Sequence, residues 1–172
     1  MSREGKAAGP RVDPEEEKAR SICLGALERR MRTRRELRDR MSRRGVSEET
    51  AEAVLSRLEA VGLVDDEAYA RSFVRSRLGS RPRGDRALAA ELWQKGIPGA
   101  VAERVLAEAA EADGPEQRAR RALAPKLRAL AGKPADEIRR KARDFLLRRG
   151  FDHETANAAL CDLLGETDDS AD

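Results

Sequence analysis

The chain has 172 residues, of which 39% are charged and only 3% are aromatic. So few bulky side chains exclude a thick single core, and the abundance of Arg, Ala, Glu and Leu favours thin layers of helices. No apolar run approaches the ~20 residues that span a bilayer, and the N-terminal segment lacks the apolar centre of a signal peptide. We therefore expect a cytoplasmic protein without membrane contact.

The two ends of the chain differ in composition from the rest. Residues 1–13 contain Gly, Pro and charges of both signs without any period, which predicts a disordered arm. Residues 165–172 are rich in acidic residues and lack apolar residues at helical spacing, which predicts an unstructured acidic tail. The folded part is expected between these two segments.

The first stretch with helical periodicity, residues 14–64, begins at a proline, which suits the first turn of a helix. Apolar residues recur three and four positions apart in its first part. Thr33 followed by Glu36 has the spacing of a capping box and predicts the start of a second helix. Ser47 is a good cap for a third. We predict a first unit of three helices over these residues.

A second unit is predicted over residues 65–113, where an Asp-Asp pair at the start can cap the first helix. Tyr69 and Phe73 lie four residues apart on that helix. Aromatic rings can stack on nucleic-acid bases, but the large apolar area that each ring buries favours a place in the core. We expect a core position for the single tryptophan, Trp93, as well, although it aligns with Ser42 and Leu147 in the other units and so need not be fully buried.

Gly114 and the proline after it break the chain before a third predicted unit, residues 114–164. Within this unit, Pro125 predicts a kinked first helix, because proline removes a helical hydrogen bond. Gly132 and Pro134 then predict the boundary before the last pair of helices.

The three units share a pattern that is centred on a glycine. Gly45, Gly96 and Gly150 are separated by 51 and 54 residues, and each has apolar residues at matching offsets before and after it. A glycine in this place is typical of a helix that ends with a left-handed residue. A period of this length predicts tandem units that continue each other's cores. We therefore predict an all-α fold of three tandem three-helix repeats that form an elongated, curved array.

The sequence contains no recognisable catalytic or cofactor-binding constellation. It has no phosphate-binding loop, paired-glycine fingerprint or zinc-ligand spacing. His153, the only histidine, is expected to be exposed near the start of a helix. Cys23 and Cys161 lie among apolar helical neighbours, so we expect two buried thiols rather than a disulfide or a metal site. We predict a non-enzymatic binding protein that needs no cofactor or metal.

Charge alternates in sign along the chain. Residues 28–44 carry nine arginines and three acidic residues, whereas residues 47–67 carry seven acidic residues and one arginine. The same alternation recurs in the later units. We therefore expect the first two helices of each unit to be basic and the third to be acidic.

Two interpretations of the basic blocks stay open at this point. A helix, a glycine turn and a further helix is also the arrangement of helix-turn-helix DNA-binding regulators, in which arginines contact phosphates. An acidic helix after each glycine argues against it, because phosphates would repel that helix. A single arginine can equally be an ordinary solvated residue.

Three stretches of the sequence resemble the signature segments of the bacterial RecX family. They are TRREL from Thr33 to Leu37, LVDDEAYARSFVRSR from Leu63 to Arg77, and ELWQKGI from Glu91 to Ile97. The resemblance extends over about residues 20–164. The chain departs from the family pattern at Ala87, where a basic residue usually precedes the aliphatic position, and Arg86 lies one step earlier.

The resemblance implies an all-α cytoplasmic regulator that lodges along the groove of the RecA filament on single-stranded DNA. RecX proteins limit filament growth, ATP hydrolysis, strand exchange and the coprotease activity that triggers the SOS response. Single-stranded or duplex DNA is a further candidate partner, and we expect a monomer. With the charge pattern, the resemblance predicts partner or nucleic-acid contacts at Arg30, Arg34, Arg35, Arg38, Arg71, Arg75, Arg83, Arg86, Lys95, Arg118, Arg121, Arg139, Arg140 and Lys141.

Overall fold

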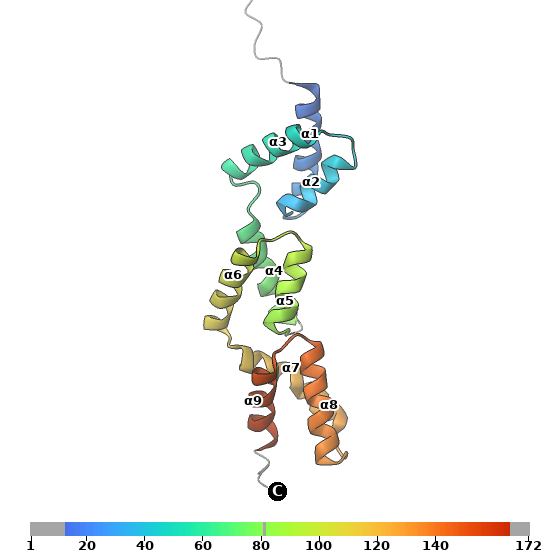
Figure 1. Ribbon diagram of the computed structural model, residues 1–172, viewed down its shortest axis with the longest axis vertical. Coiled ribbons are helices and arrows are strands. Elements are labelled where there is room, and N and C mark those ends of the chain that lie inside the picture. The colour runs from blue at the N-terminus through green and yellow to red at the C-terminus, as the bar shows by residue number, and fades with distance from the viewer. Residues whose placement is uncertain (1–12, 81, 166–172) are drawn as a thin grey trace, which may run out of the picture. The chain divides into compact units, whose positions relative to one another are not determined.

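The computed structural model describes residues 13–80 and 82–165, which form nine helices and no strand (Figure 1). The helices are α1 (Pro14–Leu27), α2 (Arg34–Ser42), α3 (Glu48–Ala60), α4 (Asp66–Ser80), α5 (Asp85–Gln94), α6 (Gly99–Ala112), α7 (Pro115–Leu130), α8 (Ala135–Arg148) and α9 (His153–Leu164). The predicted all-α fold with three-helix repeats is confirmed.

The glycine at the centre of each repeat has the predicted left-handed backbone. The φ angles of Gly45, Gly96 and Gly150 are 73°, 83° and 82°. The amide after each glycine donates a hydrogen bond to the carbonyl five residues earlier: Val46 to Met41 at 3.2 Å, Ile97 to Leu92 at 3.1 Å, and Phe151 to Leu146 at 3.2 Å. This is the Schellman arrangement, and it ends the second helix of every repeat in the same way.

The predicted helix starts are also present. The side chain of Thr33 accepts a hydrogen bond from the amide of Glu36 at 3.1 Å, and Ser47 caps α3 in the same manner. The helix α8 begins directly after Pro134. The helix α7 continues through Pro125 to its end at Leu130, so this proline does not end the helix.

The chain divides into two compact units, Met1–Asp66 and Glu67–Asp172. The core of the first unit is built around fully buried Leu37, Met41 and Leu55. The Sγ atom of Cys23 lies 3.6 Å from the Sδ atom of Met41, and burial raises the pKa of this thiol to about 11. Cys23 is therefore the buried cysteine that the sequence predicts.

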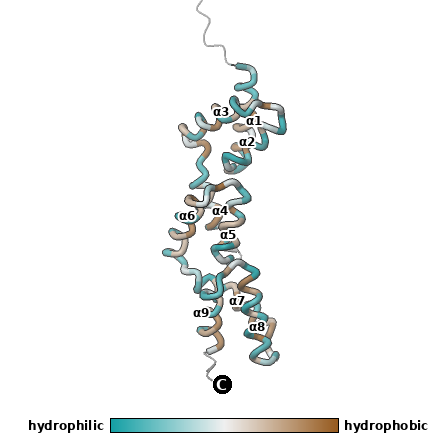
Figure 2. The backbone as a smooth tube through the Cα atoms, viewed as in Figure 1, coloured by the Kyte–Doolittle hydropathy of each residue, from teal (hydrophilic) through white to brown (hydrophobic). Residues whose placement is uncertain are grey.

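The second unit contains two hydrophobic clusters, one for each of its repeats. Tyr69 is buried, which confirms its predicted core position. Its ring centroid lies 6.2 Å from that of Phe73, which is half-buried and packs against the same cluster. Cys161 is exposed, so the prediction of a second buried thiol is wrong. Its neighbour Leu160 takes the core position on α9. Figure 2 shows how hydrophobic and hydrophilic residues alternate along the helices.

Two loops meet backbone to backbone inside the second unit. The amide of Gly84, just before α5, donates a hydrogen bond to the carbonyl of Arg149 at 3.0 Å. A Cβ atom at Gly84 would overlap with the backbone of Gly150 and Phe151, which explains why a glycine is needed there. Arg149 in turn donates to the carbonyl of Pro82 at 3.3 Å. The third repeat thereby fixes the start of α5.

The predicted arm, except for Asp13, and the predicted acidic tail, except for Gly165, lie outside the described residues. Asp13 itself caps α1 by accepting a hydrogen bond from the amide of Glu15 at 2.9 Å. None of the described helices is long and apolar enough to cross a membrane.

Candidate partner-binding surface

Many of the basic residues predicted to bind a partner are engaged by acidic residues of their own repeat. In the first repeat, Arg34 pairs with Glu52 and Glu59, and Arg38 pairs with Glu52 at 2.5 Å. These ion pairs connect α2 to α3. The hydrogen bond from Arg34 is the main reason why the pKa of Glu52 lies below its usual range. The acidic third helix therefore holds these two arginines.

The second repeat also pairs predicted binding residues with its own carboxylates. Arg71 of α4 pairs with Glu67 on its own helix and with Glu108 of α6, at 2.8 Å for the second pair. Arg83 donates to Glu91 at 2.5 Å. In both places a predicted binding residue is already neutralised by the chain.

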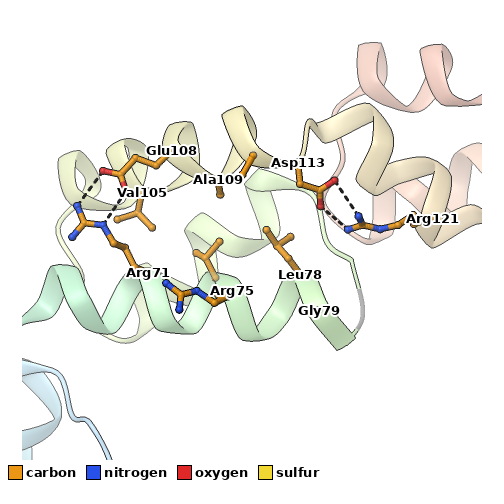
Figure 3. Close-up of a pocket in the computed structure, with 11 residues that line it drawn as sticks. Arg71, Arg75, Leu78, Gly79, Val105, Glu108, Ala109, Asp113 and Arg121 are labelled. Atoms are coloured by element: carbon orange, nitrogen blue, oxygen red, sulfur yellow. Dashed lines mark hydrogen bonds and ion pairs between the residues drawn. The ribbon is translucent and has the colours of Figure 1, made fainter.

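A groove of about 370 Å³ lies between α4 and α6 and reaches the start of α7. Its floor is apolar and includes Val74, Leu78, Val105 and Ala109. Figure 3 shows the ion pair between Arg71 and Glu108 near one end of the groove and that between Arg121 and Asp113 near the other. Arg75 also lines the groove and is exposed.

Two predicted residues of the third repeat make contacts within that repeat. Arg139 donates a hydrogen bond to the carbonyl of Gly165 at 2.7 Å, at the end of α9. Lys141 pairs with Glu137 at 2.5 Å, one helical turn away. Hydrogen bonds from Lys141, and then from Lys133, lower the pKa of Glu137 to about 2. The side chains of both predicted residues are thus already bonded to other groups of this chain.

Arg118 does not lie on the molecular surface. Its side chain is 0% exposed, and its Nη1 atom lies 2.7 Å from Oδ1 of Asp85. The pair connects α7 to the first residue of α5. The carboxylate compensates the charge of the guanidinium, which allows an arginine to be buried there. This position corrects the placement of Arg118 among the surface-binding residues.

Five predicted residues remain exposed, and their side chains make no ion pair or hydrogen bond with the other described residues: Arg30, Arg35, Arg75, Arg86 and Arg140. Lys95 is half-buried and interacts with the chain. Three of the five share one position in the repeat, because Arg35, Arg86 and Arg140 each stand ten residues before the central glycine. The second helix of every repeat therefore presents an unpaired arginine at this equivalent position.

The predicted charge of the helices is wrong in two places. Three glutamates and two basic residues give α1 a net charge of −1, and two acidic residues and one arginine give α5 the same value. The positive charge of those regions lies in the loops before α2 and α5, at residues such as Arg29 and Arg83. The third helices are acidic as predicted, with net charges of −3 for α3, −2 for α6 and −2 for α9.

Three family models match consecutive parts of the chain. They describe the first, second and third three-helix domains of RecX, and they match residues 19–58, 65–106 and 115–160. The chain belongs to the RecX family. The matched segments lie inside the three predicted repeats, whose outer bounds stay a prediction.

Relatives and solved structures agree with this family. The chain is 40% identical to the regulatory protein RecX of Streptomyces lividans over 96% of its length and 86% of the relative. It is 40% identical to that of Mycobacterium avium (strain 104) over 88% of both chains. The crystal structure of RecX from Lactobacillus salivarius superposes with a TM-score of 0.82 at 21% identity, covering 88% of this chain and 98% of the other. A second RecX crystal structure gives 0.73 at 28% identity over 83% and 71%.

The RecX relatives are named regulatory proteins. The described residues of this chain contain no group of three or more His, Cys, Asp and Glu side chains that could hold a metal ion. His153 is exposed and is the first residue of α9, as predicted.

The exposure of Trp93 on α5 differs from the sequence prediction for this RecX chain. Trp93 is 70% exposed, so the prediction of a core position is wrong. Leu88 and Leu92 occupy the core side of α5, and the next residue is rotated by about 100° around the helix. On a helix, this rotation between neighbouring positions decides which side chain faces the core and which faces the solvent.

Other exposed arginines of this RecX chain were not among the predicted binding residues. Arg43, Arg143 and Arg148 are exposed, and their side chains have no polar partner among the described residues. Arg43 and Arg148 share the position two residues before the central glycine. Comparing the repeats position by position would have identified both, whereas counting charges over whole segments did not.

Proposed function

We propose that this member of the RecX family binds the RecA filament on single-stranded DNA. It limits filament growth, ATP hydrolysis, strand exchange and the coprotease activity that triggers the SOS response. It does so as a cytoplasmic monomer without catalysis or a cofactor, through three repeats bounded at residues 14–64, 65–113 and 114–164. Matches to all three RecX domains and the names of the relatives support this proposal.

The observation that carries the proposal furthest is the repetition of one unpaired cation. Arg35, Arg86 and Arg140 are exposed at equivalent positions in the three repeats, whereas other predicted residues such as Arg34 and Arg118 are paired with carboxylates. A filament presents the same surface on each of its subunits, and its DNA presents phosphates at regular intervals. Repeats that display the same guanidinium are suited to such a ligand, because each can make the same charge-assisted contact.

The alternative of a helix-turn-helix transcription regulator is not supported by the charges. In such a regulator the helix after the turn enters the major groove. The corresponding helices here are α3, α6 and α9, and all three carry net negative charge. Phosphates would repel them, so the basic residues of the second helices are better placed to act on a filament.

The proposal is tested by reversing two of the repeated charges, Arg86→Glu with Arg140→Glu. Neither side chain has a polar partner among the described residues, so helicity and melting temperature should stay nearly unchanged. The concentration of protein that inhibits the RecA ATPase on single-stranded DNA by half should rise about tenfold or more. Inhibition by the wild type should also weaken as salt rises.

The matched control reverses two arginines on third helices, Arg57→Glu with Arg104→Glu. It changes the net charge by the same amount. Each substitution also removes one exposed ion pair, which contributes little to the free energy of unfolding. The control should inhibit RecA like the wild type. Equal loss of RecA inhibition in both double variants would show that the effect depends only on the net charge of the protein. Full inhibition in both would show that the repeated arginines do not contact the filament.

A further inference from the structure

The outer face of α5 carries an arginine and a tryptophan on one stripe. Arg86 and Trp93 are seven residues apart, so they lie within about 20° of each other around the helix. Both point away from the core side, which is formed by Leu88 and Leu92. Ala90 lies between them, and its small exposed side chain leaves the stripe open. Trp93 is the only tryptophan of the chain and is 70% exposed.

The charges of α5 leave this stripe positive. The helix has two carboxylates, and both are neutralised: Asp85 pairs with buried Arg118, and Glu91 pairs with Arg77 at 3.0 Å and also with Arg83. Arg86 has no such partner among the described residues. An anionic ligand would therefore meet one unpaired guanidinium and no unpaired carboxylate on this helix.

The isolation of the indole favours nucleic acid over protein as that ligand. A tryptophan at the centre of a protein interface is usually surrounded by further apolar contacts. On α5 the exposed neighbours of Trp93 along the stripe are Ala90 and Arg86, and no other described residue of this helix is an exposed large apolar one. A single flat ring beside a cation is the combination that holds an unpaired base by stacking and its phosphate by charge.

We propose that the outer face of α5 binds single-stranded nucleic acid, with one base stacked on the indole of Trp93 and a phosphate paired with Arg86. The two side chains leave the helix about 10 Å apart along its axis. A single strand spans this distance with a few nucleotides. A duplex would not bind in this way, because its bases are stacked on each other. The inference goes beyond the proposed function, since it predicts contact with the strand in the absence of RecA.

The single tryptophan makes the contact directly measurable. The full chain, without RecA, is titrated with an oligothymidylate of about 15 nucleotides, which is within the site sizes of known single-strand binders. Stacking should quench the tryptophan fluorescence, and the quenching should weaken as salt rises. An abasic strand of the same length should bind through its phosphates without quenching. Unchanged fluorescence at saturating oligothymidylate would overturn the proposal.

Variants of Trp93 separate stacking from general apolar contact. With a fluorescently labelled strand, Trp93→Leu should weaken binding on the order of ten- to a hundredfold, and Trp93→Phe should retain most of it. Both variants should fold, because the side chain is exposed. Arg86→Met should reduce affinity and flatten its dependence on salt. Equal affinity of the wild type and Trp93→Leu would overturn the stacking contact.

Two further outcomes would also overturn this proposal. One is equal quenching by a duplex of the same sequence. The other is a Trp93→Leu protein that binds the strand normally but no longer binds RecA, which would make Trp93 a protein contact. A different result would separate the two proposals. If Trp93→Leu fails to bind the strand and the wild type does not inhibit RecA, the stacking site is supported and the proposed function is wrong. The two proposals therefore fail separately.

Discussion

The groove between α4 and α6 and the outer face of α5 belong to the same repeat, but Arg71 in the groove and Arg86 on that face differ in their partners. In the groove, Arg71 is held by Glu67 and Glu108. On the outer face of α5, Arg86 has no polar partner among the described residues. The residue type is the same, and the difference comes from what lies opposite each side chain.

In the first repeat, the carboxylates of the third helix decide which arginines are neutralised. Arg34 and Arg35 are adjacent in sequence, yet Arg34 faces α3 and pairs with its glutamates, while Arg35 faces away and is exposed. One step along a helix rotates a side chain by about 100°, which is enough to separate a structural arginine from one available to a ligand. The same step separates buried Leu92 from exposed Trp93.

The largest difference between the two sides of α5 is expected when the same charge is placed on each. Leu92→Asp should unfold the second repeat, because a carboxylate in that fully buried position has no partner, at a loss of about 4 kcal/mol or more. Trp93→Asp should change the free energy of unfolding by roughly 0.5 kcal/mol or less. Urea denaturation followed by circular dichroism measures both. Similar losses in the two variants would show that Trp93 is packed.

A second test addresses the pair that keeps α5 free of unpaired carboxylates. Asp85→Ala leaves the buried guanidinium of Arg118 without its partner and should destabilise by roughly 2 kcal/mol or more. Arg118→Met keeps much of the buried stem and leaves Asp85, whose side chain is 39% exposed and can be solvated, so the loss should be about 1 kcal/mol. Thermal unfolding of both variants measures the order. The reverse order would contradict the assignment of Arg118 as the buried member.

Much of the fold follows from local chemistry that sequence displays directly. Left-handed glycines such as Gly96, the cap at Thr33 and the helical spacing of Leu88 and Leu92 are properties of a few neighbouring residues. They predicted the helices and the repeat. The family resemblance then suggested the partner that we propose, although it did not show which side chains are free.

The candidate site was harder to predict because it depends on neighbours from other helices. Net charge per segment gave equal weight to buried Arg118, neutralised Arg71 and exposed Arg86. The exposure of Trp93 and Cys161 followed from one-residue rotations on short helices that hydrophobic spacing does not resolve. Only the contact between α7 and α5 shows that an arginine lies in the interior.

The ion pairs of Arg71 make a small contribution to stability that depends on pH. Arg71 lowers the pKa of Glu108, and Arg104 and Arg71 lower that of Glu67. A carboxylate whose pKa is lower in the folded protein stabilises it above the unfolded pKa of about 4.3, and this stabilisation is lost as pH falls through the folded value. Arg71→Met should therefore be slightly less stable than the wild type near neutral pH.

That difference should shrink as pH falls below about 4 and should be smaller at high salt, because the ion pairs are exposed. Arg86→Met is the matched control, since Arg86 has no carboxylate partner among the described residues and should follow the wild-type melting curve at every pH. Melting temperatures at neutral and acidic pH compare the three proteins. A pH-dependent loss in Arg86→Met equal to that of Arg71→Met would mean that Arg86 is paired in solution, and the outer face of α5 would lose the free cation on which its binding role depends.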